Sequence, residues 1–204
     1  MRGAGESLFE RRHKRGWRNL ACAAAVAVGC LTELNGVRAA DDSVSGEYQM
    51  KANFLAMAPN FVEWPKDTSG RVTKTFQICV FGSFPFGTAL AELTRTTEVN
   101  GKRVEVRWVH QESELGSCQI VFVSRSEDRH YGRVLAAMRD TSALTVGETP
   151  DFVETGGIVS LGTHGGGLEI SVNLEAAQRA RLKISARLLA LAQRVIGRGA
   201  GARG

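Results

Sequence analysis

The side chains most often used in catalysis and metal binding stand apart in this sequence. The histidines after residue 40 are His110, His130 and His164, and no second His or Cys lies at metal-ligand spacing from any of them. The chain has no Gly-x-Ser-x-Gly elbow, and neither Cys79 nor Cys118 lies near a histidine, so nucleophilic catalysis has no local support. We therefore predict no catalytic residue and no metal ligand.

Two carboxylates, Glu63 and Glu169, have the right chemistry for a general acid or base. Each stands alone on a predicted element, and single carboxylates are common on protein surfaces. We assign neither of them a catalytic role.

Two glycine-rich segments lie where a nucleotide phosphate could bind. Residues 82–87 follow a strand and open a helix, but their spacing differs from G-x-G-x-x-G, and Pro85 with two Phe would crowd a pyrophosphate. Residues 162–167 lack the Lys-Ser/Thr of a P-loop and precede a strand, so no helix N-terminus faces a phosphate. Both segments are interpreted as turns, and no cofactor is predicted.

The first 39 residues have the organisation of an export signal. Basic residues between Arg11 and Arg18 precede an uncharged, Ala-rich run at residues 20–31, and Val37 and Ala39 are small residues suited to a cleavage site. The apolar run is shorter than the roughly 20 residues that span a bilayer. We predict a signal peptide at 1–39, one domain at 40–196 and a disordered Gly/Arg tail at 197–204. A cytosolic N-terminal helix and a lipoprotein processed at Cys30 are the alternatives.

Charge gives no indication of a nucleic-acid partner once the predicted signal is removed. Seven of the 26 Lys/Arg and three of the 21 Asp/Glu lie before residue 40, which leaves a net charge of +1. A nucleic-acid binder needs a dense basic stripe. The nearest candidates, Arg179, Arg181, Lys183 and Arg187, are spread along one predicted helix, as on a solvated helix face.

Helical and strand patterns alternate along the remaining chain. Apolar residues recur at helical spacing from Tyr48 toward Trp64, and Pro59 should kink or break that helix. Further helices are predicted at residues 86–96, 126–139 and 174–196. Strands are predicted at 75–81, 103–109, 118–124 and 144–146, with a turn at 150–154 and a hairpin joining 157–162 to 168–173. This order predicts an α/β fold with a mostly parallel sheet, helices on both faces, a C-terminal hairpin and a long last helix.

The predicted strands indicate where the cysteines lie. Cys22 and Cys30 leave with the predicted signal, whereas Cys79 lies inside the first strand and Cys118 opens a later one. In an oxidising compartment such a pair favours a disulfide, provided that the two Cα atoms lie within about 7 Å. Two buried free thiols are the alternative.

A set of short motifs, in order along residues 46–196, resembles one known family. The motifs are EYQMKA (47–52), FVEWP (61–65), ICVFG (78–82), PFG (85–87), CQIVFVS (118–124), LTVG (144–147), GGIV (156–159), NLEAA (173–177) and LKIS (182–185). They are similar to those of the YfiR family of periplasmic proteins.

This resemblance implies a Rossmann-like α/β fold without a nucleotide site. It also implies a periplasmic repressor that binds the sensor domain of an inner-membrane diguanylate cyclase and lowers cyclic di-GMP synthesis. An OmpA-like outer-membrane lipoprotein as a sequestering partner, a homodimer and redox-sensitive cysteines belong to the same family picture. Cys79 and Cys118 match one family cysteine pair, whereas the second pair is absent near Val153 and Ser171.

Two departures from the family pattern bear on partner choice. Pro59 stands where members continue the helix, and Ser83-Phe84 replaces a more acidic turn. Two other classes of function are kept as alternatives. One is a periplasmic small-ligand-binding module that serves another membrane sensor, such as a histidine kinase. The other is an enzyme whose site is assembled from distant residues.

Overall fold

The computed structural model describes residues 44–65 and 74–197, which all belong to the compact unit Ser43–Gly204. The predicted signal peptide at 1–39 and residues 198–204 of the predicted tail lie outside the described residues, so both stay predictions. Within the described residues, no helix is both long and apolar enough to cross a bilayer.

An eight-stranded mixed sheet organises the domain, in the order β10-β8-β7-β6-β5-β2-β4-β3. Its strands are β2 (Thr75–Phe81), β3 (Glu98–Val99), β4 (Lys102–Val109), β5 (Ile120–Val123), β6 (Leu144–Gly147), β7 (Val159–His164), β8 (Gly167–Asn173) and β10 (Arg194–Ile196). Five of the pairings are parallel, and the hairpins β3–β4 and β7–β8 are antiparallel. The chain places β4 on one side of β2 and then crosses back to place β5 on the other.

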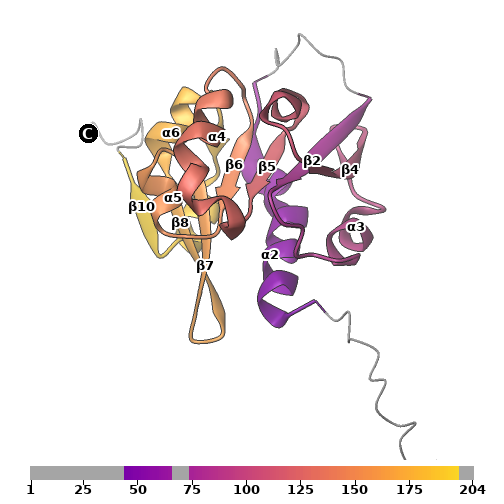
Figure 1. The fold of residues 1–204 in the computed structure, drawn as a ribbon, viewed down its shortest axis with the longest axis horizontal. Helices are drawn as coiled ribbons and strands as arrows, with labels where there is room; N and C mark the ends of the chain where they lie inside the picture. The colour runs from indigo at the N-terminus through magenta and orange to yellow at the C-terminus, as the bar shows by residue number, and fades with distance from the viewer. Residues whose placement is uncertain (1–43, 66–73, 198–204) are drawn as a thin grey trace, which may run out of the picture. The chain divides into compact units, whose positions relative to one another are not determined.

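Helices cover both faces of this sheet, as the sequence predicts (Figure 1). Alternate side chains of β2 enter two different clusters. Phe76, Ile78 and Val80 pack with α2 (Gly46–Met57) and α3 (Ala89–Thr94). Cys79 and Phe81 point the other way, toward Leu115 of the 3₁₀ helix η2 (Glu112–Ser117) and Val134 of α4 (Tyr131–Ala137). Because strand side chains alternate between faces, one apolar run can supply both cores.

The first helix breaks near Pro59, as the sequence predicts, and does not continue as an α-helix toward Trp64. Ser45 caps α2, since its side chain accepts a hydrogen bond from the Tyr48 N–H. The α-helix stops at Met57, and Pro59 lies in the first turn of a 3₁₀ segment, η1 (Ala58–Phe61). A proline is tolerated in a first turn because its missing N–H would have no partner there.

The remaining elements differ from the prediction mainly at their bounds. The helix predicted at 126–139 is a 3₁₀ segment, η3 (Arg125–His130), followed by α4, and the turn at 150–154 contains a one-turn helix, α5 (Asp151–Glu154). The predicted hairpin is confirmed: β7 and β8 pair in register from Val159↔Val172 to His164↔Gly167.

The prediction of one long helix at 174–196 is wrong. The segment forms four short elements: α6 (Leu174–Arg179), β9 (Lys183–Ile184), α7 (Ala186–Leu191) and β10. Arg181 has a φ of 60°, and the Leu182 N–H bonds back to the Ala177 carbonyl, a geometry that terminates a helix. The two strands then pair with segments distant in sequence: β9 with β1 (Val62–Glu63), and β10 with β8. Tertiary pairing therefore overrides the helical periodicity of these residues.

Candidate functional site

The two cysteines are joined by a disulfide that ties β2 to the start of β5. The Cα atoms of Cys79 and Cys118 are 5.9 Å apart, and the residues are 0 % and 4 % exposed. Exchange of a disulfide requires a thiolate to reach one of its sulfur atoms. Because both residues are buried in an apolar cluster, this bridge acts as a structural cross-link in the folded protein.

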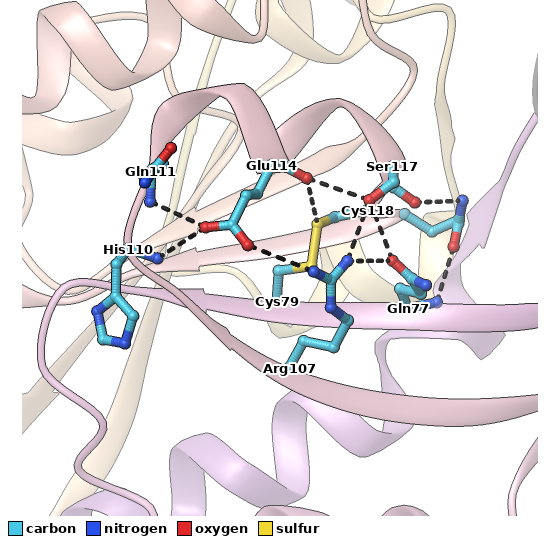
Figure 2. Close-up of a disulfide and its surroundings, with 9 residues drawn as sticks. Gln77, Cys79, Arg107, His110, Gln111, Glu114, Ser117 and Cys118 are labelled. Atoms are coloured by element: carbon cyan, nitrogen blue, oxygen red, sulfur yellow. Dashed lines mark hydrogen bonds and ion pairs between the residues drawn. A yellow bond between two sulfur atoms is a disulfide. The ribbon is translucent and has the colours of Figure 1, made fainter.

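A polar network covers the bridge on the outer side of β2 and β4 (Figure 2). Arg107, opposite Cys79 in the β2–β4 register, donates hydrogen bonds to Gln77 Oε1 at 3.1 Å and Ser117 Oγ at 3.3 Å. Its other guanidinium nitrogen lies 3.5 Å from Glu114 Oε1. One arginine thus connects both strands to η2, the segment that delivers Cys118.

Glu114 has a second role at the start of η2. Its Oε2 accepts the backbone N–H of Gln111 at 3.1 Å and that of His110 at 3.2 Å. These hydrogen bonds, from Gln111 and then His110, lower the pKa of Glu114 because they favour the charged carboxylate. The carboxylate therefore both caps η2 and orients Arg107.

The loop after β2 lies at the carboxyl ends of the parallel strands, where strand order reverses between β2 and β5. In open α/β sheets this is the usual ligand crevice. Here Gly82, with a φ of +90°, passes so close to Ser126 that an added Cβ would lie 2.6 Å from its Oγ. The Ser83 N–H already donates to Ser126 Oγ at 3.0 Å, so it is not free for a phosphate oxygen. The loop at residues 82–87 therefore serves as a structural turn.

An exposed aromatic group lies beside this turn. Trp108 is 54 % exposed, its ring centroid is 4.7 Å from that of His110 and 5.8 Å from that of Phe84, and its Nε1 donates to the Gly82 carbonyl at 2.7 Å. We call Phe84, Trp108 and His110 the Trp108 surface. A cavity of about 390 Å³ adjoins it, also bordered by Glu127. A tryptophan held in place by its hydrogen bond but open on one face is typical of protein recognition sites.

A buried ion pair fastens α2 to the carboxyl end of β6. Lys51 Nζ lies 2.7 Å from Glu148 Oε1, and both side chains are 0 % exposed. Lys51 also pairs with Glu47 one turn earlier, and Glu148 Oε2 accepts the Arg125 backbone N–H at 2.6 Å. Burial, and then the charge of Glu148, raises the pKa of Tyr48 to about 12.

The structure does not bring the sequence candidates for acid–base chemistry together. Glu63 lies on β1 and pairs with Lys183 on the surface, whereas Glu169 lies on β8. His130 contacts Glu127 at 3.2 Å, and His164 ends β7. Within residues 44–65 and 74–197, no group of three His, Cys, Asp or Glu is arranged to hold a metal ion.

The four basic residues considered for nucleic-acid binding do not share one helix. Arg179 ends α6, Arg181 lies in the turn after it, Lys183 is on β9 and Arg187 is on α7. The single helix face on which the sequence places them is not formed.

The sequence did not predict the Lys51–Glu148 ion pair or the network of Arg107 and Glu114. Lys51 and Glu148 are 97 residues apart, and Glu148 directly follows a short strand as if it began a turn. The available signal was a lysine on the apolar side of a helix, four residues after Glu47. Arg107 gave no such signal, because it lies within the continuous strand β4 and its place opposite Cys79 is set by the β2–β4 register.

Two of the solved structures that match this chain are proteins of low sequence identity. One is the ABC domain in complex with L-Trp from Streptococcus pneumonia, at 16 % identity and a TM-score of 0.48. The other is a conserved domain protein from Vibrio cholerae O1 biovar eltor, at 15 % identity and a TM-score of 0.47. Each alignment covers 74 % of this chain and 60 % of the other, so the chain spans about three fifths of either protein.

Comparison with curated proteins gives no significant match. The model of one protein family, DUF4154, described as YfiR/HmsC-like, does match, over residues 48–193. The match runs from the first turn of α2 to the residue before β10, and so includes the disulfide, the Lys51–Glu148 pair and the Trp108 surface. The chain belongs to the YfiR/HmsC-like family.

Proposed function

We propose that this protein is a periplasmic regulator that binds the periplasmic domain of an inner-membrane diguanylate cyclase and represses cyclic di-GMP synthesis. The observation that carries the proposal is the family match across residues 48–193. The protein acts by binding, and its buried disulfide suits a domain that must keep its shape in an oxidising compartment.

The Trp108 surface is the contact that we assign to the cyclase. Its tryptophan is exposed yet fixed by the hydrogen bond to Gly82, so little side-chain entropy is lost on binding. Trp108→Ala should weaken repression, whereas Leu191→Ala, a matched change at a residue 55 % exposed on α7, should not. Equal repression by both variants would place the contact elsewhere on the molecule.

Repression requires the protein to bind the inactive form of the cyclase more tightly than the active form, because only differential affinity shifts an equilibrium. Deleting the gene should therefore raise cellular cyclic di-GMP. The full chain, supplied again, should lower it, and a version without residues 1–39, held in the cytoplasm, should not. No rise on deletion, or equal rescue by both versions, would contradict the proposal.

Export is part of the same proposal and can be tested separately. N-terminal sequencing of the periplasmic protein should begin near Ala40, and an intact Met1 or a lipid on Cys30 would contradict the predicted cleavage. A homodimer and sequestration by an OmpA-like outer-membrane lipoprotein complete the proposed system. Sedimentation of the purified protein tests the first, and a pull-down with that lipoprotein tests the second.

A further inference from the structure

A cavity of about 240 Å³ lies between α4 and α6, over the start of β6. Figure 1 shows both helices on the same part of the sheet, with α5 beside them. Ala143, Ile158 and Ala176 give it an apolar floor, Arg139 and Arg179 also line it, and none of its lining residues is acidic. Its volume is near the lower limit of small-molecule sites, which begin at about 300 Å³.

The two arginines have no carboxylate partner among the described residues. Elsewhere in the described part of the chain, the arginines that pair with a glutamate are Arg107, Arg133 and Arg194. Arg179 lies against the backbone of Gly156, since a Cβ added there would be 3.7 Å from Nη2. Two unpaired guanidinium groups at one cavity suit an oxyanion, because each presents a fork of N–H donors.

A buried hydroxyl group provides a second, independent observation. Thr145, which is 5 % exposed, lines the cavity, and its Oγ1 accepts the Ile158 N–H at 3.0 Å. Thr145 Oγ1 is therefore partnered as an acceptor, whereas no hydrogen bond donated by its O–H to residues 44–65 and 74–197 is seen. Buried donors without acceptors cost free energy, and a ligand oxygen at this position would remove that cost for Thr145.

Helix capping accounts for only part of this arrangement. Arg179 is the last residue of α6, and Arg139 follows the end of α4, so each could interact with terminal carbonyl groups. Capping does not explain why both side chains border one cavity that the buried Thr145 also lines. We propose that this cavity binds the carboxylate or phosphate group of a small solute.

The proposal goes beyond the regulatory function and does not depend on it, because the test uses the purified protein alone. Inorganic phosphate and succinate are titrated separately into ¹⁵N-labelled protein, at an ionic strength held constant with sodium chloride. We expect saturable shifts of the Thr145 and Gly156 amide resonances with at least one probe. Saturation by phosphate only or by succinate only would identify the oxyanion class.

The variant Arg139→Gln/Arg179→Gln should raise the dissociation constant at least about tenfold, because it removes the charged donors. Arg179→Lys keeps the charge but loses the fork, and it should have an intermediate effect. Arg187→Gln on α7 is the matched control, since Arg187 is exposed, as Arg139 and Arg179 are, but lies outside the cavity. Amide spectra of the unliganded variants verify that the fold is retained. No saturable shift with either probe, or equal weakening by Arg187→Gln, would overturn the proposal.

Discussion

The Lys51–Glu148 pair makes a quantitative prediction about stability. Lys51→Met keeps most of the aliphatic stem but removes the ammonium group, which leaves a 0 % exposed carboxylate with only neutral donors among the described residues, the Arg125 N–H and the Tyr48 hydroxyl group. Breaking a buried pair by removing one partner typically costs about 3–5 kcal/mol, a large share of the roughly 5–15 kcal/mol that stabilises a domain. With a slope of about 2 kcal/mol per molar urea, the unfolding midpoint should fall by about 1.5–2.5 M.

A second variant separates the pair from other effects of the substitution. Lys51→Met/Glu148→Gln removes both charges but keeps an amide oxygen for the Arg125 N–H, so it should regain about 2 kcal/mol or more. Lys183→Met is the control, because its partner Glu63 is 77 % exposed, and such pairs often contribute nothing measurable. A loss below about 1 kcal/mol for Lys51→Met, or a double variant no more stable than the single one, would refute this account.

Three further predictions follow from the cysteines, Glu114 and the tyrosines. Thiol counting on unfolded, unreduced protein should find neither Cys79 nor Cys118 free, and reduction should cost about 3–4 kcal/mol for a loop of this length; two free thiols would exclude the bridge. Because the folded pKa of Glu114 lies below its ordinary 4.5, its contribution is present above pH 4.5 and is lost as pH falls through the folded value. Glu114→Gln should flatten that acid limb in pH-dependent urea unfolding, and an unchanged profile would contradict the assignment. The pKa values of both tyrosines, Tyr48 and Tyr131, are raised chiefly by burial, so absorbance near 295 nm should show less phenolate at pH 10 in folded than in unfolded protein. Because the pKa of Tyr48 rises from 10.0 to about 12, its stabilising effect is complete below pH 10 and is lost as pH rises through that interval; identical titration curves would contradict this.

Elements with a strong local signal could be predicted from the sequence. β2 occupies residues 75–81 as predicted, because a β-favouring apolar run ends at Gly82. Gly82 has a positive φ, a conformation that glycine adopts readily and other residues rarely do. The β7–β8 hairpin was predicted from its glycine-rich tip, and the break in the first helix from Pro59. In each case the deciding interactions lie within a few residues along the chain.

The features that the sequence did not predict depend on contacts between residues that are far apart in the chain. Nothing within residues 174–196 shows that β9 must pair with β1, or β10 with β8, and the spacing of their apolar residues also fits a helix. The candidate site has the same difficulty, since Trp108 lies beside Gly82 and Lys51 beside Glu148 only after the sheet has formed. The disulfide could be predicted because both cysteines were expected on neighbouring strands, and the structure places Cys118 just before one of them, β5.

The strand order has a consequence for how the chain folds. The β7–β8 hairpin can close locally, through Gly165 and Gly166 at positive φ, but the parallel pairings on both sides of β2 require closure of long loops. Domains built from such distant pairings fold slowly. We therefore expect this hairpin to form early and β10, the edge strand beside it, to pair with β8 afterwards. The edge pairing of β10 with β8 forms only after the chain has passed through α6, β9 and α7, so this side of the described sheet is completed by a contact between segments distant in sequence.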